Sequence, residues 1–399
     1  FTPNEYKPYS QKWEDVDKQL LKPENTQFGE HLSLTNPFRP ETKQAYNSEM
    51  NFEEKIICAF QVLKKKMAWN GRYQLYSKEL EKVIKKGSGS NADLNFILIS
   101  ILKDFGLEAY PVVMSRRSSG MLPYNFPSLQ KLKTFFVAIH DINKQKYVFL
   151  DSSMDVPAFN ILPLELSVNK ARMLSLKEKE EKKWVNVMAL SHNKSFMKID
   201  ARIEGNQVKG HRSTVLYGQE AIEYQANENH KQDNLVSNPE NKVSQKEKLT
   251  VTNLKVKKQE NDWALIEEEF DFVLQADRTD DHLYINPMLF PQLKSNPFIQ
   301  TERVLPIEFP YPYKFTMLST LTLPEGYEVE ELPQSQSIRS EGDGLQCKYM
   351  IQQQGNTILL NYVFHLKGYI FLSEQYKQLQ ELWAKVIEKN NALIVLKKI

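Results

Sequence analysis

The sequence predicts an α+β protein in which a mixed first domain is followed by a β-rich second domain. Helical segments precede a group of strands in the first half, without the alternation of strand and helix that builds a parallel sheet. After residue 196, segments that alternate apolar and polar residues dominate, and this period is typical of half-buried strands. The length of 399 residues suits two domains of ordinary size. We therefore predict domains at residues 1–183 and 184–399.

The first predicted helix of this domain carries apolar residues at helical spacing, which allows one face to pack on a core. Cys58 lies on the opposite side of the same helix. Because a free cysteine behaves as a small apolar side chain, we predict a buried structural thiol there. The apolar stripe consists of Phe52, Ile56, Phe60, Leu63 and Met67.

A second helix, predicted at residues 94–105, is apolar almost all round, as is typical of a helix at the centre of a domain. Ser90 and Asp93 match a capping box that uses Asp in place of Glu. Gly106 follows the last predicted turn, where glycine commonly ends a helix. Both limits of the central helix are therefore predicted.

Strands are expected after this helix at residues 109–115, 135–139 and 147–150, and a turn at 141–145 joins the last two. The segment 116–132 is rich in Ser, Gly and Pro. We predict that it forms a loop across the open side of the sheet.

A run of mixed charge at residues 177–183 has no apolar face. It marks either the junction between the domains or the solvated end of a helix. The strands predicted beyond it indicate a β-sandwich-like second domain with one late helix, at 376–386, and a final strand at 392–396. The polar segment 227–248 is predicted to be a mobile loop. The main predicted strands of this domain are 197–203, 249–256, 270–274, 315–323 and 358–366.

Composition excludes several classes of function. Lys and Arg number 52 against 50 Asp and Glu, and a net charge of +2 argues against a nucleic-acid partner. No apolar run approaches the roughly 20 residues of a transmembrane helix. Cys58 and Cys347 are too few for a disulfide framework and leave the redox compartment open. The seven histidines never pair at helical spacing, so we expect no metal and no cofactor.

The order of a glycine-rich loop, a helix, a strand, a long loop and two strands ending in Leu150-Asp151 resembles the core of the transglutaminase-like superfamily, which shares its fold with papain-type enzymes. In that superfamily a Cys begins the central helix within a Gly-x-Cys-x-Asp pattern, where the helix N-terminus lowers the pKa of the thiol. A His acts as general base, and an Asp orients it. The resemblance implies a papain/transglutaminase-like domain of helices and an antiparallel sheet.

Two of the three catalytic positions differ in this chain. Asn91 stands where the superfamily has Cys, and Thr134 stands where it has His, whereas Asp151 matches the orienting Asp. An amide is not a practical nucleophile, and a hydroxyl cannot accept a proton near pH 7. The resemblance therefore implies a vestigial triad and no catalytic residue.

The resemblance extends to large proteins found widely in Bacteroidetes, in which an N-terminal β domain precedes a transglutaminase-like and a C-terminal β domain. It rests on Leu162-Pro163, Arg303-x-x-Pro306 and Leu323-Pro324-x-Gly326-Tyr327. Members are usually exported, which implies a periplasmic or envelope location. Since the chain begins at Phe1 without an initiator Met, we expect a processed or truncated piece that lacks the N-terminal domain.

The leading hypothesis is a non-catalytic binding or scaffolding module of the cell envelope. Its former substrate groove would accept a peptide, protein or glycan. The candidate contacts are Ser90, Arg116, Arg117, Tyr124 and Phe126. These residues can equally serve only to solvate and pack their loop.

Two alternatives stay open. The first is a peptidase or amide-transfer enzyme with relocated catalytic residues, such as Ser90 with His140 as base. Ser90 is explained more simply as a helix cap, and His140 lies about six residues, or ~20 Å of extended chain, beyond Thr134. The second alternative is a purely structural role in an envelope assembly, which makes no demand on the groove.

Overall fold

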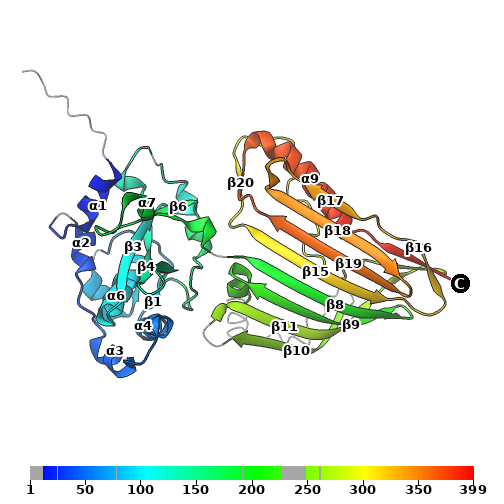
Figure 1. The fold of residues 1–399 in the computed structure, drawn as a ribbon, viewed down its shortest axis with the longest axis horizontal. Coiled ribbons are helices and arrows are strands. Elements are labelled where there is room, and N and C mark those ends of the chain that lie inside the picture. The colour runs from blue at the N-terminus through cyan, green and yellow to red at the C-terminus, as the bar shows by residue number, and fades with distance from the viewer. Residues whose placement is uncertain are drawn as a thin grey trace, which may run out of the picture. The chain divides into compact units, whose positions relative to one another are not determined.

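The computed structural model describes residues 12–24, 26–77, 79–123, 125–190, 192–225, 249–259 and 262–399. The chain forms two compact units, Phe1–Ser191 and His192–Ile399, so the division falls between residues 191 and 192 rather than between 183 and 184. Figure 1 shows the elements of each unit. The predicted mobile loop at 227–248 and the candidate residue Tyr124 lie outside the described residues.

The first unit combines helices with one main sheet, as the α+β prediction requires. The strands predicted at residues 109–115, 135–139 and 147–150 are confirmed as β3, β4 and β5. The helices are α1 (Trp13–Leu21), α2 (Gln27–Leu32), α3 (Arg39–Ala45), α4 (Phe52–Lys66), α5 (Leu80–Lys86), α6 (Asn91–Asp104) and α7 (Glu180–Lys183). The strands are β1 (Ala68–Trp69), β2 (Ser88–Gly89), β3 (Glu108–Met114), β4 (Thr134–Asp141), β5 (Lys146–Leu150), β6 (Lys170–Met173) and β7 (Trp184–Asn186).

The main sheet of the first unit has five strands in the order β5-β4-β3-β6-β7, and all neighbours are antiparallel. Helices α4 and α6 pack on one face of it, where Phe96 and Phe60 join Phe135 and Val137 in one apolar cluster. Strand β7, whose residues fall within the predicted second domain, pairs with β6 in this sheet. The first core therefore continues beyond residue 183.

The central helix α6 begins and ends where the sequence predicts. The Ser90 backbone N–H donates to Asp93 Oδ2 over 2.7 Å, and the Asp93 N–H donates back to Ser90 Oγ over 3.3 Å, which completes the capping box. Gly106 ends the helix with a φ of 75°. A Cβ on Gly89 would lie 2.6 Å from a Val83 methyl, so the close approach to the helix start requires glycine.

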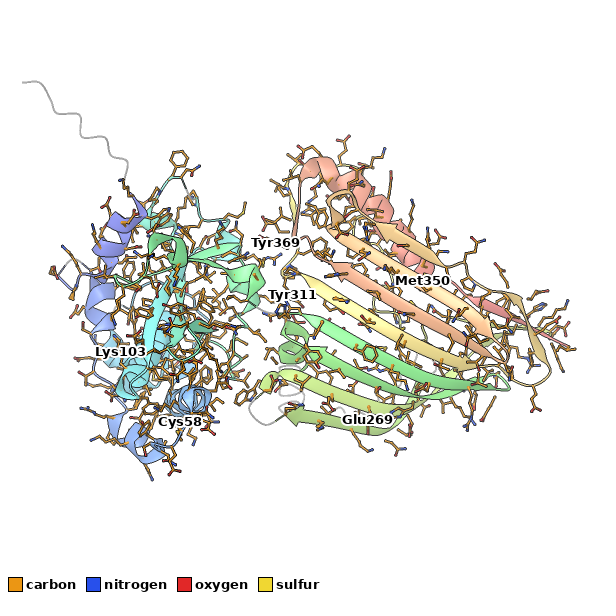
Figure 2. The ribbon with its side chains drawn as sticks, in the orientation of Figure 1. Cys58, Lys103, Glu269, Tyr311, Met350 and Tyr369 are labelled. Atoms are coloured by element: carbon orange, nitrogen blue, oxygen red, sulfur yellow. The ribbon has the colours of Figure 1, made fainter. Side chains whose placement is uncertain are left out.

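The predicted helix around Cys58 is confirmed as α4, and the thiol is buried with 8% exposure. Figure 2 labels this side chain on α4. Its Sγ lies 3.6 Å from the carbonyl oxygen of Ala45, and burial raises the pKa of the thiol. A buried, protonated thiol suits a structural role.

A buried ion cluster connects the first helix to the sheet. Arg172 on β6 is 0% exposed and donates from Nε and Nη2 to the two carboxylate oxygens of Asp17 on α1, each over 2.7 Å. It also donates to Glu180 over 2.7 and 2.9 Å, and Lys183 Nζ donates to Asp17 over 3.2 Å. The rings of Trp13 and Trp184 flank the guanidinium at 5.8 and 5.0 Å.

This cluster explains the charge run at residues 177–183. The run was interpreted as a domain junction or as a solvated helix end, yet Lys183 is 8% exposed and contributes to the cluster together with Glu180. The charge run is therefore not only a solvated surface, because part of it belongs to a buried ion cluster. Side chains from α1, β6 and α7 meet here because the fold brings residues 17 and 172 together.

The second unit is rich in strands, as predicted. The late helix of residues 376–386 is confirmed as α9 (Tyr376–Asn390), and the final strand is β21. The strands are β8 (Lys194–Glu204), β9 (Gln207–Tyr217), β10 (Leu249–Gln259), β11 (Asp262–Gln275), β12 (Asp277–Arg278), β13 (His282–Ile285), β14 (Ile307–Glu308), β15 (Tyr313–Thr322), β16 (Tyr327–Glu331), β17 (Gln336–Arg339), β18 (Leu345–Gln354), β19 (Thr357–Leu366), β20 (Ile370–Phe371) and β21 (Ile394–Lys398).

Eight of these strands form one large sheet in the order β10-β11-β9-β8-β15-β19-β18-β17. Within it β8 and β15 run parallel, and every other neighbouring pair is antiparallel. One face packs on α9 and on a four-stranded sheet, β12-β13-β21-β16, so a helix shares the second layer of the predicted sandwich. The opposite face carries the exposed residues of the alternation, among them Leu318 and Met350. Figure 2 labels Met350.

Among the described helices, none combines the length and the apolar character that a bilayer crossing requires.

The ion cluster predicts a large stability effect at Asp17. Replacing it in Asp17→Ala removes the buried one of the two carboxylates that bind the Arg172 guanidinium and leaves only the part-exposed Glu180. We expect a loss of about 3 kcal/mol in the free energy of unfolding, measured by urea denaturation, because removing one member of a buried pair strands the other charge.

The matched control is Glu79→Ala, which removes an ion pair with Lys82 whose side chains are 60% and 75% exposed. An exposed pair contributes at most about 1 kcal/mol. Equal effects of the two substitutions would show that the cluster does not hold α1 in place.

Candidate functional site

The candidate site lies at the N-terminus of α6, where the helix packs against the sheet. Asn91 is the first residue of α6, Thr134 is the first residue of β4, and Asp151 directly follows β5. Since β4 and β5 are antiparallel neighbours, the beginning of one lies beside the end of the other. The chain thus places all three positions at one end of the sheet.

The three side chains converge. Asn91 Nδ2 donates to Thr134 Oγ1 over 2.7 Å and to the Phe135 carbonyl over 3.1 Å, and it lies 3.4 Å from Asp151 Oδ2. Asn91 Oδ1 accepts from the Gln74 backbone N–H over 3.0 Å. Hydrogen bonds at both the nitrogen and the oxygen therefore fix the orientation of the Asn91 amide.

Asn95, one helical turn further along α6, belongs to the same network although the sequence analysis missed it. Its Nδ2 donates to the Phe135 carbonyl over 2.8 Å and to Asp151 Oδ2 over 3.0 Å, and its Oδ1 accepts from the Ser152 N–H over 2.9 Å. Two amides at i and i+4 in an otherwise apolar helix were the available signal.

Asp151 is a buried carboxylate, 1% exposed. Its Oδ1 accepts from the Ser153 N–H over 2.9 Å and from the Ser153 hydroxyl, and its Oδ2 faces the two amides. Burial raises the pKa of this carboxyl, because it disfavours the charged form, while the hydrogen bonds from Ser153, Asn95 and Asn91 oppose that rise.

A polar path leads outward from this carboxylate. The Tyr73 hydroxyl lies 3.2 Å from Ser153 Oγ, and Tyr73 is only partly buried. Burial raises the pKa of Tyr73, so its hydroxyl stays protonated near neutral pH. No sequence pattern indicated that Tyr73 or Ser153 belongs to the site.

The triad positions are closed to solvent. Asn91 and Thr134 are 0% exposed and Asp151 is 1% exposed, and the neighbouring Asn95 is also 0% exposed. The segment before α5 covers the helix start, since the Asn91 N–H donates to the Arg72 carbonyl over 3.0 Å. In this conformation a substrate carbonyl cannot reach the place of a nucleophile.

The predicted binding residues are engaged elsewhere or point outward. Ser90 Oγ donates to Asp93 Oδ2 over 2.7 Å as part of the helix cap. Arg116 lies 3.7 Å from Glu165, and Arg117 begins the short 3-10 helix Arg117–Ser119. Phe126 is 76% exposed. Within the described residues, the network around Asn91 therefore uses side chains other than these.

His140 does not pair with Ser90. Its Nδ1 lies 3.2 Å from Glu108 Oε2, and its ring stacks on Tyr147 with centroids 4.8 Å apart. Hydrogen bonds from Lys177 and His140 lower the pKa of Glu108 to about 2. A base for Ser90 is thus not provided by this histidine.

In the part of the chain that the structure describes, no group of three or more His, Cys, Asp or Glu side chains is arranged to hold a metal ion.

Comparison with known proteins finds a family model that matches part of the chain and solved structures of similar fold. Residues 281–396 match the model of a family described as "Domain of Unknown Function with solved-structure structure (DUF3858)". No match is found among curated proteins. A crystal structure described as a "putative protease" from Parabacteroides distasonis ATCC 8503 is similar over 92% of this chain, with a TM-score of 0.54 and 12% identity.

The two chains share a fold. The match covers 57% of the Parabacteroides protein, so this chain spans just over half of its length. At 12% identity the likeness concerns the fold and does not transfer residue roles.

From the burial of Asp151 we predict that the stability difference between the wild type and Asp151→Asn depends on pH. Because the pKa of Asp151 is raised above its usual value of 3.8, the folded state holds this proton more tightly than the unfolded chain does. The resulting stabilisation is complete below that value and is lost as the pH rises through the raised pKa.

We therefore expect the unfolding free energy of the wild type, minus that of Asp151→Asn, to fall as the pH is raised from about 3.5 to 7, with a slope of up to about 1.4 kcal/mol per pH unit. Urea denaturation at a series of pH values measures it. The control is Asp155→Asn, at a side chain 85% exposed. A flat difference for Asp151→Asn would contradict the role of burial.

The closure of the site predicts an unreactive thiol in Asn91→Cys. The position is 0% exposed, so the introduced thiol should not react with Ellman's reagent until the protein is unfolded. Phe126→Cys, at a position 76% exposed, is the matched control and should react at once. Comparable rates for the two thiols would show that the site opens to solvent.

Proposed function

We propose that this chain is a non-catalytic protein with a transglutaminase-like first unit, which acts as a binding or scaffolding module of the cell envelope. The supporting observation is the buried network in which Asn91 donates to Thr134 and faces Asp151. The ligand class we propose is a peptide, a protein or a glycan.

The chemistry of the network supports this proposal. Acyl transfer by a triad needs a nucleophile whose proton passes to a base within hydrogen-bond reach. Here the helix start offers an amide group that donates to a hydroxyl over 2.7 Å, and neither group acts as a base near pH 7. In an active enzyme of this fold, the corresponding contact would join the nucleophile to its base. Here the hydrogen bond from Asn91 to Thr134 holds α6 against β4.

The envelope location rests on resemblance alone. The fold relative comes from Parabacteroides distasonis, and the sequence resembles exported proteins of Bacteroidetes. A binding role in the first unit would fall to residues outside the buried network, among which Phe126, 76% exposed on the loop before β4, is an accessible aromatic candidate.

A relocated peptidase or amide-transfer activity is the second candidate, and the description of the Parabacteroides protein as a "putative protease" favours it. Such an activity would need a nucleophile and a base other than Asn91 and Thr134. Ser90 would be its first nucleophile to test, although its hydroxyl donates to Asp93.

The deciding experiment measures turnover by the purified chain. Hydrolysis of fluorescently labelled casein and incorporation of a dansylated amine into casein test the two reactions of the fold class. We expect rates equal to those of the buffer, because no described nucleophile at the site is activated.

Ser90→Ala and Asp151→Asn serve as matched variants, with circular dichroism to confirm that they fold. Turnover by the wild type that disappears in either folded variant would overturn the non-catalytic proposal and establish the second candidate. Turnover that is unchanged in both variants would point to an active site elsewhere in the chain and would also overturn it.

A further inference from the structure

Two lysines lie side by side on the outer face of the large sheet in the second unit. Lys194 on β8 and Lys314 on β15 are direct partners in the parallel register, and Lys314 is also opposite His365 on β19. Like charges placed directly opposite one another across strands destabilise a sheet. The repulsion between the two lysines therefore costs folding free energy, and the fold does not require lysine at both positions.

Two other lysines on the same face, Lys198 and Lys255, are neutralised by carboxylates. Lys198 lies 2.7 Å from Asp200, and Lys255 lies 2.9 Å from Glu269. Lys194 Nζ instead lies 4.6 Å from the ring centroid of Tyr217. Within the described residues, neither Lys194 nor Lys314 has a carboxylate within ion-pair distance. A local excess of positive charge results.

The pKa of the neighbouring His365 is consistent with this excess of positive charge. The pKa of His365 is lowered, first by burial and then by the charges of Lys367 and Lys314. Lys367 is itself paired with Asp343. The positive charge that remains without a partner is centred on Lys194 and Lys314.

The two lysines border a surface pocket. Its volume is about 340 Å³, and the other side chains that line it outward from the sheet are Phe196, Val215, Tyr217 and Thr316. Phe196 is 37% exposed although it is aromatic. The pocket thus combines two ammonium groups, apolar side chains and the hydroxyls of Tyr217 and Thr316, which is the usual composition of a small-ligand site.

We propose that this pocket binds a carboxylate carried on a ring. The carboxylate would lie between Lys194 and Lys314, where two charge-assisted hydrogen bonds can form and the repulsion between the lysines is relieved. The ring would lie against Phe196 and Val215. A free aromatic acid and an acidic sugar unit of a glycan share this chemistry. The site is in the second unit and does not depend on whether the first unit is catalytic.

Sodium benzoate and sodium glucuronate are the probes, and benzamide is the uncharged analogue of benzoate. Saturation-transfer NMR with the full chain gives the dissociation constants. We expect Lys194→Gln/Lys314→Gln to weaken binding by at least about tenfold, because both charged donors are lost. Binding should also weaken as the salt concentration rises, since the pocket is open to solvent.

Lys198→Gln is the matched control, since it removes a lysine from the same face and strand that is already paired with Asp200. It should change the dissociation constant by less than about twofold, as expected for an exposed charge outside the pocket. The thermal midpoint of Lys314→Gln in the absence of probe should equal or exceed that of the wild type, because a like-charge contact is removed.

The outcomes separate the possible sources of the ligand. Binding of benzoate alone supports an aromatic acid, and binding of glucuronate, with or without benzoate, supports an acidic sugar. The proposal is overturned if neither probe binds saturably below about 20 mM. It is also overturned if the double variant binds as the wild type does, or if benzamide binds as well as benzoate.

Discussion

The hydrogen bonds that tie the start of α6 to the sheet are the constraint on which the first unit depends. The helix is buried through residues 91–102, so its polar side chains must find partners inside the protein. Asn91 and Asn95 both donate to the Phe135 carbonyl and face Asp151. These contacts fix the helix against β4 and β5 in one orientation, since an unmatched amide or carboxylate in this place would cost free energy.

The same geometry would serve catalysis if its residues were different. A helix N-terminus beside the start of one strand and the end of the next is a place where a thiolate can be stabilised and a base held in reach. Here an amide and a hydroxyl occupy the positions, and the carboxylate of Asp151 accepts from Ser153 instead of orienting an imidazole. In a closed site of this kind the contacts contribute to stability.

The second unit distributes its charges unevenly over one sheet. Its inner face is a continuous apolar core with α9, so the ligand-accessible chemistry is confined to the opposite face. There, most charged side chains are neutralised by neighbours, as Lys255 is by Glu269. Lys194 and Lys314 are direct register partners, and neither has a carboxylate within ion-pair distance among the described residues, which distinguishes their pocket from an ordinary solvated surface.

The sequence by itself determined the local elements: the limits of α6 follow from Ser90, Asp93 and Gly106, and the strands follow from apolar periodicity, because these signals act over a few residues. It also aligned Asn91, Thr134 and Asp151, through a resemblance. Only the tertiary structure decided that Asn95 joins them, that Arg172 binds Asp17 across 155 residues, and that β7 belongs to the first sheet. Contacts between residues so distant in sequence depend on sheet register and on packing between elements. Neither can be predicted from sequence patterns that extend over only a few residues.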